Sequence, residues 1–361
     1  MRILLISGIV FVHIPHDPQT SPFLGTYSLF DWLRVFLGDS LFRVGVPCLS
    51  AISGYLLFRR GLDGFDYRKV LRTKAMTILV PFLIWNLAFL LLVFAAQTKG
   101  MGFGYLPDVV GATPLELADL AFAIESWPIN IPLYFLRDLL LCLLLSPLLG
   151  FLMMRYPRVT LLILLAYAVL PVPNGIFLKK SILFGFCVGI YVSLHKIDVK
   201  RLDPYAAPIF AAVFAAAVAL SVGLYQTGPE FPVWLDALRS LLALSGILGA
   251  WALSSMLVAT RFGMALSSGG GLSFWIFCGH YPLLILCWMV WNRLGISHYP
   301  LFYCMAPLVT LAVLVITHMA VKRTLPGLHG LLTGSRAAPS RTAPAGSSAA
   351  AGRTKYSPQQ R

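Results

Sequence analysis

Arg2 and His13 are the first pair of side chains in this sequence that could carry chemistry. They stand eleven positions apart in an apolar stretch, which corresponds to about three turns of a helix. Both therefore project from nearly the same helix face, displaced by about 16 Å along the axis. A guanidinium near a membrane surface and an imidazole deeper in would suit an extended anionic cofactor whose reactive end points inward. Spacing alone leaves a second interpretation open, in which Arg2 is an interfacial anchor and His13 is a hydrogen-bonded structural residue.

A basic stretch between Arg59 and Lys74 is the second candidate, and it leads into an apolar segment. Such a cluster is typical of a cytoplasmic loop, because membrane proteins concentrate Lys and Arg on that side. Arg72 and Lys74 could also hold the phosphates of a nucleotide at the inner face of the membrane. The sequence predicts the topological role and leaves the binding role as a hypothesis.

Small residues mark the segment 46–56, where Ser50, Ser53 and Gly54 lie within an apolar run. Residues of this size let membrane helices approach closely, and serine hydroxyls can bond to neighbouring backbone. Packing is the expected role of Ser50 and Gly54, whereas Ser53 is also a weak candidate for substrate binding.

Three further sites each have a structural and a functional interpretation. Asp31 and Arg34 lie three positions apart and could pair on an interfacial helix or touch a sugar. Arg137 and Asp138 stand just inside an apolar segment, where a buried ion pair that fixes packing is the first expectation and a substrate contact the second. His280 is expected to be a hydrogen-bonded core residue, with a catalytic contact as the weaker alternative.

The composition shows which elements must position these residues. Hydrophobic residues make up 58% of the 361-residue chain and charged residues only 12%, about half the charge of a soluble domain. A bilayer core about 30 Å thick requires about 20 apolar residues per helix. The sequence predicts an all-α, polytopic transmembrane helical bundle with about ten spans, near residues 2–14, 41–58, 75–96, 131–153, 159–172, 176–194, 205–225, 234–258, 272–291 and 300–321. The first of these is short for a crossing, so we expect either a helix that enters part way or a start upstream of Met1.

The formal net charge of +14 is explained by topology and not by nucleic acid, because the basic residues gather in short loops. Alternation of the spans puts these loops on one side and both termini in the cytoplasm. Lys179 and Lys180 are exceptions, since they fall on the opposite side. Residues 1–325 are expected to form one transmembrane domain. The Ala/Ser/Pro/Arg-rich segment 335–361 is expected to be a disordered cytoplasmic tail.

The sequence offers little support for other chemistries. The six cysteines are scattered and show no metal-ligand spacing, so no metal site is expected. Neither a GxSxG nucleophile turn nor a phosphate-binding P-loop occurs.

The order of several motifs resembles the acyltransferase 3 family, whose members are membrane enzymes that O-acylate carbohydrates. The motifs are Arg2-x10-His13, Val46-Pro47 with Ser53-Gly54-Tyr55, the basic loop into Lys74 with Pro81-Phe82 and Trp85, Pro132-Leu133-Tyr134-Phe135-Leu136, and His280-Tyr281-Pro282-Leu283. The resemblance covers nearly the whole chain except the tail. Within the family the sequence looks most like acetyltransferases of xanthan-type exopolysaccharide synthesis. Thr77 departs from the pattern, because a basic residue is frequent at that position.

The resemblance implies an O-acetyltransferase in a bacterial inner membrane, with Arg2 and His13 as catalytic residues. The implied donor is acetyl-CoA from the cytoplasm, and the implied acceptor is a sugar hydroxyl on a lipid-linked oligosaccharide. His13 would serve as general base on that hydroxyl or would carry a transient acyl group. Two other classes stay open: a secondary transporter or polysaccharide exporter, and a scaffold that binds other polysaccharide assembly proteins.

Overall fold

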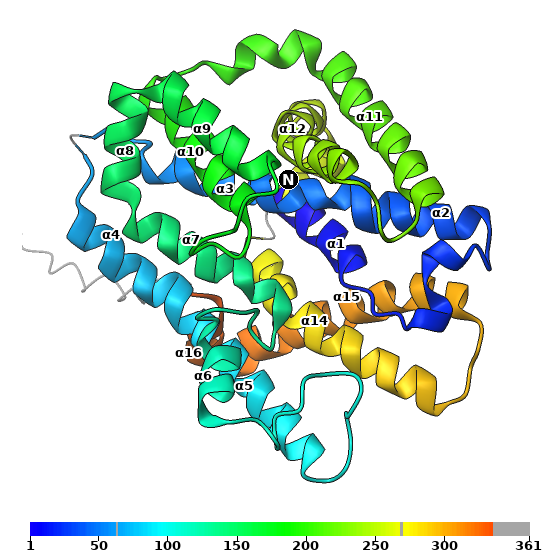
Figure 1. Cartoon of the computed structure of the whole chain (residues 1–361). Coiled ribbons are helices and arrows are strands. Elements are labelled where there is room, and N and C mark those ends of the chain that lie inside the picture. The colour runs from blue at the N-terminus through cyan, green and yellow to red at the C-terminus, as the bar shows by residue number, and fades with distance from the viewer. Residues whose placement is uncertain (63, 268–269, 335–361) are drawn as a thin grey trace, which may run out of the picture.

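The computed structural model describes residues 1–62, 64–267 and 270–334. Within these ranges the regular structure is helical, with one isolated β-bridge between Phe103 and Leu106. The α-helices are α1 (Arg2–Val12), α2 (Leu29–Val35), α3 (Gly45–Leu57), α4 (Tyr67–Lys74), α5 (Val80–Gln97), α6 (Pro114–Phe122), α7 (Tyr134–Leu144), α8 (Ser146–Arg155), α9 (Pro157–Val169), α10 (Lys180–Leu194), α11 (Ala206–Thr227), α12 (Val233–Leu257), α13 (Arg261–Ser267), α14 (Gly270–Arg293), α15 (Tyr299–Thr324) and α16 (Pro326–Thr333). Figure 1 shows α1 near the middle of the bundle and α11 along its edge.

Every predicted span has a helical counterpart in the described residues. Six continuous helices are long and apolar enough to cross a membrane, and a bent pair is a seventh candidate. Three shorter apolar helices, α1, α9 and α10, account for the remaining predicted spans. The prediction of a helical membrane bundle is confirmed, although these three helices are too short to cross a bilayer core of about 30 Å at about 1.5 Å per residue.

The bent pair consists of Ile131–Leu144 and Ser146–Arg155, whose axes differ in direction by 65°. Pro147 lies in the first turn of the second helix. Proline has no N–H and clashes with the preceding helical turn, so it ends α7 and starts α8. The Ser146 hydroxyl donates a hydrogen bond of 2.6 Å to the Leu143 carbonyl at this junction. The bend turns one predicted span into two helices of different direction.

Helices α3 and α10 pack with their backbones in close contact because glycines line the contact. A Cβ added to Gly54 would lie 2.1 Å from the Phe186 carbonyl oxygen, and one added to Gly189 would lie 1.9 Å from that of Ala51. Neither position can hold a larger residue without separating the helices. The Ser50 hydroxyl also donates to the carbonyl of Ile182. Ser50 and Gly54 therefore have the packing role predicted for them.

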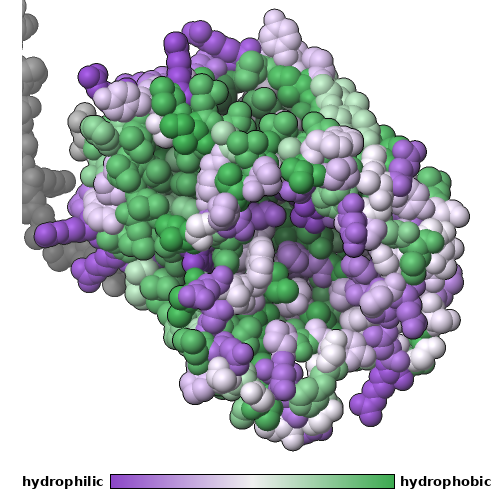
Figure 2. All heavy atoms as spheres, in the orientation of Figure 1, coloured by the Kyte–Doolittle hydropathy of each residue, from purple (hydrophilic) through white to green (hydrophobic). Residues whose placement is uncertain are grey.

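The outside of the bundle is apolar over much of its area, as expected for a surface in contact with lipid. Large hydrophobic side chains are exposed on many helices, among them Leu91, Leu162, Ile163, Leu308 and Ile316. Figure 2 shows hydrophobic residues over much of the upper and left parts of one face, and hydrophilic residues around its hollowed middle. Polar groups in this chain thus gather in the interior, where a site is expected.

Helix α16 folds back against α5, so the chain continues in ordered contact beyond the predicted end of the domain at residue 325. The Trp85 indole N–H donates a 3.0 Å hydrogen bond to the Leu332 carbonyl. His329 on α16 lies against His318 on α15, with Nε2 and Nδ1 3.3 Å apart. These contacts attach α16 to the bundle. The predicted tail 335–361 lies outside the described residues.

Candidate active site

His13 lies at the C-terminal end of α1, where the helix stops. Its backbone is no longer helical (φ −106°, ψ 10°), and its N–H still bonds to the Val10 carbonyl. The Ile14-Pro15 sequence that follows explains the stop, because a residue before proline avoids the helical region. The Tyr299 hydroxyl donates a 2.9 Å hydrogen bond to the Pro15 carbonyl. The imidazole therefore lies at a helix end whose following segment is hydrogen-bonded to Tyr299, the first residue of α15.

His280 lies beside His13. The two ring centroids are 5.4 Å apart, and the ring of Tyr281 meets His13 edge-on at 6.1 Å. His280 is fully buried on α14, and its Nδ1 lies 3.0 and 2.8 Å from the carbonyl oxygens of Ile276 and Phe277. Carbonyl oxygens only accept, so Nδ1 carries the proton and Nε2 is left as an acceptor. This buried Nε2 has no hydrogen-bond partner among the described residues.

Pro282 explains the polar network next to His280. Since proline has no N–H, it leaves the Cys278 carbonyl, four residues earlier, without its helical partner. The Asn130 side-chain amide donates to this carbonyl at 3.0 Å. Asn130 is held in turn by its own N–H, which donates to the side-chain oxygen of Asn86 at 3.0 Å. The His280-Tyr281-Pro282 sequence thus provides an imidazole, an aromatic wall and a helix defect that fixes a neighbouring loop.

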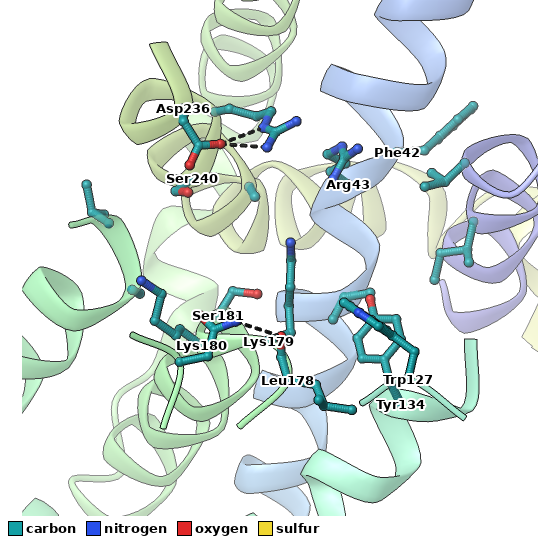
Figure 3. A pocket seen from close by; sticks show the side chains of 18 of the residues that line it. Phe42, Arg43, Trp127, Tyr134, Leu178, Lys179, Lys180, Ser181, Asp236 and Ser240 are labelled. Atoms are coloured by element: carbon teal, nitrogen blue, oxygen red, sulfur yellow. Dashed lines mark hydrogen bonds and ion pairs between the residues drawn. The ribbon is translucent and has the colours of Figure 1, made fainter. Parts of the chain in front are cut away.

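A cavity of about 540 Å³ opens next to His13, which is one of its lining residues. Cationic side chains from three parts of the chain also line it: Arg43, Lys179 with Lys180, and Arg239. Figure 3 shows the Lys179 side chain extending toward the end of the cavity where Arg43 and Asp236 lie, with Trp127 and Tyr134 on the other side. The cavity joins an imidazole, several cations and an aromatic pair.

The aromatic pair consists of Trp127 and Tyr134, whose rings meet edge-on with centroids 4.7 Å apart. Both line the cavity. Tyr134 is buried, whereas Trp127 is exposed over 41% of its surface. An indole exposed at a cavity wall offers an apolar face on which a sugar ring can stack.

The predicted cations of the inner face lie elsewhere. Arg2 is exposed at the start of α1, and Arg72 is exposed on α4. Lys74 is half-buried at the end of α4 and interacts electrostatically with Arg2. The like charges of Arg2 and Lys74 thus repel each other, and neither residue is among those that line the cavity at His13.

Asp31 and Arg34 form a buried ion pair of 3.1 Å, with side chains 0% and 4% exposed. The Arg34 guanidinium lies 4.2 Å from the centroid of the Tyr299 ring, and Tyr299 is the residue that bonds to Pro15. The burial favours the pairing alternative over a sugar contact. The pair supports the backbone next to His13 through Tyr299.

Arg137 and Asp138 also pair, at 2.9 Å, and each fixes a loop. Arg137 donates to the backbone carbonyls of Ala123 and Ile124 at 2.9 Å each. Asp138 accepts hydrogen bonds from the backbone N–H groups of residues 178 and 179. This geometry agrees with the packing role expected first, and it also sets where Lys179 enters the cavity.

Ser53 is half-buried, and its hydroxyl donates to the Leu49 carbonyl one turn earlier at 2.9 Å. It is not among the residues that line the cavity. Its contact satisfies the hydroxyl within its own helix.

Sequence reasoning missed Arg43 and Asn130, because a single Arg or Asn in an apolar stretch has no pattern that distinguishes it from an anchor or a loop residue. Lys179 carried a signal, since it departs from the predicted charge distribution. No group of three or more His, Cys, Asp or Glu residues that could hold a metal lies in the described part of the chain.

Comparison with known proteins agrees with the resemblance seen in the motifs. The acyltransferase 3 family, described as an acyltransferase domain, matches residues 1–319. The chain is similar to the succinoglycan biosynthesis protein ExoH of Rhizobium meliloti (strain 1021), with 64% identity over 364 residues that cover 100% of this chain and 97% of the relative. No solved structure matches. The chain belongs to the acyltransferase 3 family and is a transmembrane acyltransferase.

Proposed function

We propose that this protein is an O-acetyltransferase of a bacterial inner membrane that moves acetyl from acetyl-CoA to a sugar hydroxyl of a lipid-linked exopolysaccharide repeat unit. The single observation that carries the proposal is the pairing of His13 with His280 at the wall of a 540 Å³ cavity. The exopolysaccharide acceptor is supported by the name of the relative, a succinoglycan biosynthesis protein.

His13 is the base in this proposal. An imidazole exchanges its proton near neutral pH, and a sugar hydroxyl in the cavity would lie beside it. The unprotonated Nε2 of His280 is suited to accept a hydrogen bond from an N–H of His13. Such a bond would fix the ring of His13 and leave its other nitrogen free to accept the hydroxyl proton.

In the acyl transfer, one proton moves and one carbon–sulfur bond is exchanged for a carbon–oxygen bond. The hydroxyl gives its proton to His13 while its oxygen bonds to the thioester carbonyl carbon. The carbon–sulfur bond breaks, and the departing thiolate takes up the proton that His13 received, which returns the imidazole to its neutral form. Transfer through an acyl group on His13 divides the same change into two steps.

In this proposal, the nucleotide part of acetyl-CoA binds at the inner face of the membrane. Arg2 and Lys74 lie close enough to interact electrostatically, with Arg72 on the same helix as Lys74. Cations of this kind bind phosphate oxygens through charge-assisted hydrogen bonds. The pantetheine arm of acetyl-CoA would extend from this cluster along α1 and bring the thioester toward His13, which lies about 16 Å from Arg2 along the helix axis.

The experiment that tests the proposal is complementation of a strain in which the gene has been deleted. Ester-linked acyl groups of the secreted polymer are measured by proton NMR, with polymer yield as a second readout. We expect unchanged yield, loss of acetyl in the deletion strain, and restoration by the wild-type gene. Loss of the polymer itself would favour an exporter. Unchanged acetyl with loss of a different acyl ester would overturn acetyl-CoA as the donor.

A further inference from the structure

The cations of the cavity are only partly neutralised. Arg43 and Arg239 share the carboxylate of Asp39, at 2.6 and 3.7 Å. Arg239 also bonds to Asp236 at 2.6 Å. Four cations line the cavity, Arg43, Lys179, Lys180 and Arg239. Within the described residues their ion pairs are with two carboxylates, so the cations exceed these partners by two charges.

Among these four cations, Lys179 is the one whose side chain makes no hydrogen bond to the described residues. The Lys180 ammonium donates to the carbonyls of Leu170 and Val172, at 2.7 and 3.0 Å. No hydrogen bond of the Lys179 ammonium is found within the described residues, and the charges that act on it are three cations, Arg43, Arg239 and Lys180, and one carboxylate, Asp236. Figure 3 shows it directed into the cavity.

Arg43 provides an independent sign of a missing ligand. Its Nε is buried and has no hydrogen-bond partner in the described part of the chain. A buried donor that stays unpaired is destabilising. Arg43 and Lys179 line the same cavity. One bound anion could accept hydrogen bonds from both the Arg43 Nε–H and the Lys179 ammonium.

The predicted topology gives these cations no other role. Lys179 precedes α10, whose C-terminal end leads into the basic segment 195–201, and Arg239 lies in the N-terminal part of α12. In the predicted topology both lie on the side opposite the one on which positive charges determine orientation. Cations placed at depth on the other side are expected to serve a ligand.

We propose that Lys179, Arg43 and Arg239 form a subsite that binds a phosphate or carboxylate group carried by the sugar acceptor. The inference rests on the proposed function, in which the donor nucleotide occupies the inner cations and the acceptor enters the cavity. Trp127, at the same cavity, provides the surface for the sugar ring. The substrate class is thus an anionic glycolipid or acidic oligosaccharide, and a neutral sugar is a poor acceptor.

The test compares Lys179→Gln with Lys179→Arg and with the matched control Lys99→Gln, which removes an exposed lysine outside the cavity. Full-length protein in nanodiscs is titrated with the diphosphate-linked oligosaccharide by calorimetry, and steady-state kinetics follow. We expect Lys179→Gln to weaken binding and raise the KM for the acceptor by about tenfold or more, the effect of losing one charge-assisted hydrogen bond. The KM for the acyl donor stays unchanged, Lys179→Arg keeps most of the affinity, and Lys99→Gln matches the wild type.

Two further acceptors identify the anion. One carries the same sugars on a neutral lipid, and the other has its sugar carboxylates reduced. The anion that is recognised is the one whose removal makes wild type and Lys179→Gln bind equally.

Equal affinity of Lys179→Gln and wild type for every acceptor would overturn the subsite. A rise in the KM for the donor alone would also overturn it. The calorimetric binding needs no turnover, so it separates this failure from a failure of the proposed function, in which the wild type would acylate none of the carbohydrates.

Discussion

The imidazole rings of His13 and His280 lie with their centroids 5.4 Å apart, although one ends α1 and the other lies within α14. Two observations indicate that the two rings can share a hydrogen bond. The Nδ1 atom of His280 is occupied by backbone carbonyls, and its Nε2 is a buried acceptor without a partner among the described residues. His280 can therefore accept a hydrogen bond through Nε2, and His13 is the imidazole that lies beside it.

Replacing His280 with Gln should lower kcat for acyl transfer by about 10²-fold, within the range that general-base catalysis contributes. The KM values should change little, because His280 acts through His13. His298→Gln, an exposed imidazole, is the control and should keep wild-type rates. A change in KM with kcat intact would contradict the positioning role. The pH profile of kcat should also shift, which a purely structural defect would not cause.

Tyr299→Phe removes the hydrogen bond to the Pro15 carbonyl and keeps the ring under Arg34. The expected loss in unfolding free energy is about 1 kcal/mol, the typical net value of one such bond. The turnover should fall by about threefold to tenfold, because the segment next to His13 gains freedom. Thermal unfolding in detergent and initial rates measure the two effects. Wild-type values for both would show that the bond does not support His13.

Arg34→Leu leaves the carboxylate of Asp31 buried and unpaired. Removal of one partner of a buried pair costs about 3–5 kcal/mol, so this variant should be recovered in low yield with a clearly lower Tm. Arg201→Leu is the control, because the Arg201–Asp198 pair is 3.9 Å long and exposed over 85% and 57% of its side chains. An exposed pair contributes about 0–1 kcal/mol. Equal Tm values for the two variants would contradict the structural role of Asp31 and Arg34.

Asn130→Ala should lower stability by about 1–3 kcal/mol, because the Cys278 carbonyl loses its donor. In a Pro282→Ala background the N–H at position 282 can bond to that carbonyl, and Asn130 becomes less important. A double-mutant cycle on Tm or denaturant unfolding should therefore give a coupling energy above about 0.5 kcal/mol. Strict additivity would show that Pro282 and Asn130 act independently.

The helical bundle was predictable because long apolar runs have few alternatives in a bilayer. The bend between α7 and α8 has a signal in Pro147, and the predicted span 159–172, which corresponds to α9, is shorter than the length of about 20 residues that a crossing requires. The short length of α10 was not predictable, since it depends on what packs against the helix. The folding of α16 against Trp85 also had no signal in the sequence, because an eight-residue apolar segment is compatible with many structures.

The candidate site was predictable in part. The spacing of Arg2 and His13 marked the imidazole as a candidate, and the charge pattern marked Lys179 as an exception. The partnership of His13 with His280 and the contact of Asn130 with Cys278 join residues far apart in the sequence. Such contacts follow from tertiary packing, which neither periodicity nor local spacing encodes.

The most direct test of the central claim is the rate of acyl transfer by purified, nanodisc-embedded His13→Ala, measured with radiolabelled acetyl-CoA and the lipid-linked oligosaccharide. A general base contributes about 10²- to 10⁴-fold to a rate, so transfer should fall by at least that range while the Tm and the binding of acceptor stay close to wild type. Full activity of a folded His13→Ala protein would contradict the assignment of His13 as the residue that activates the sugar hydroxyl.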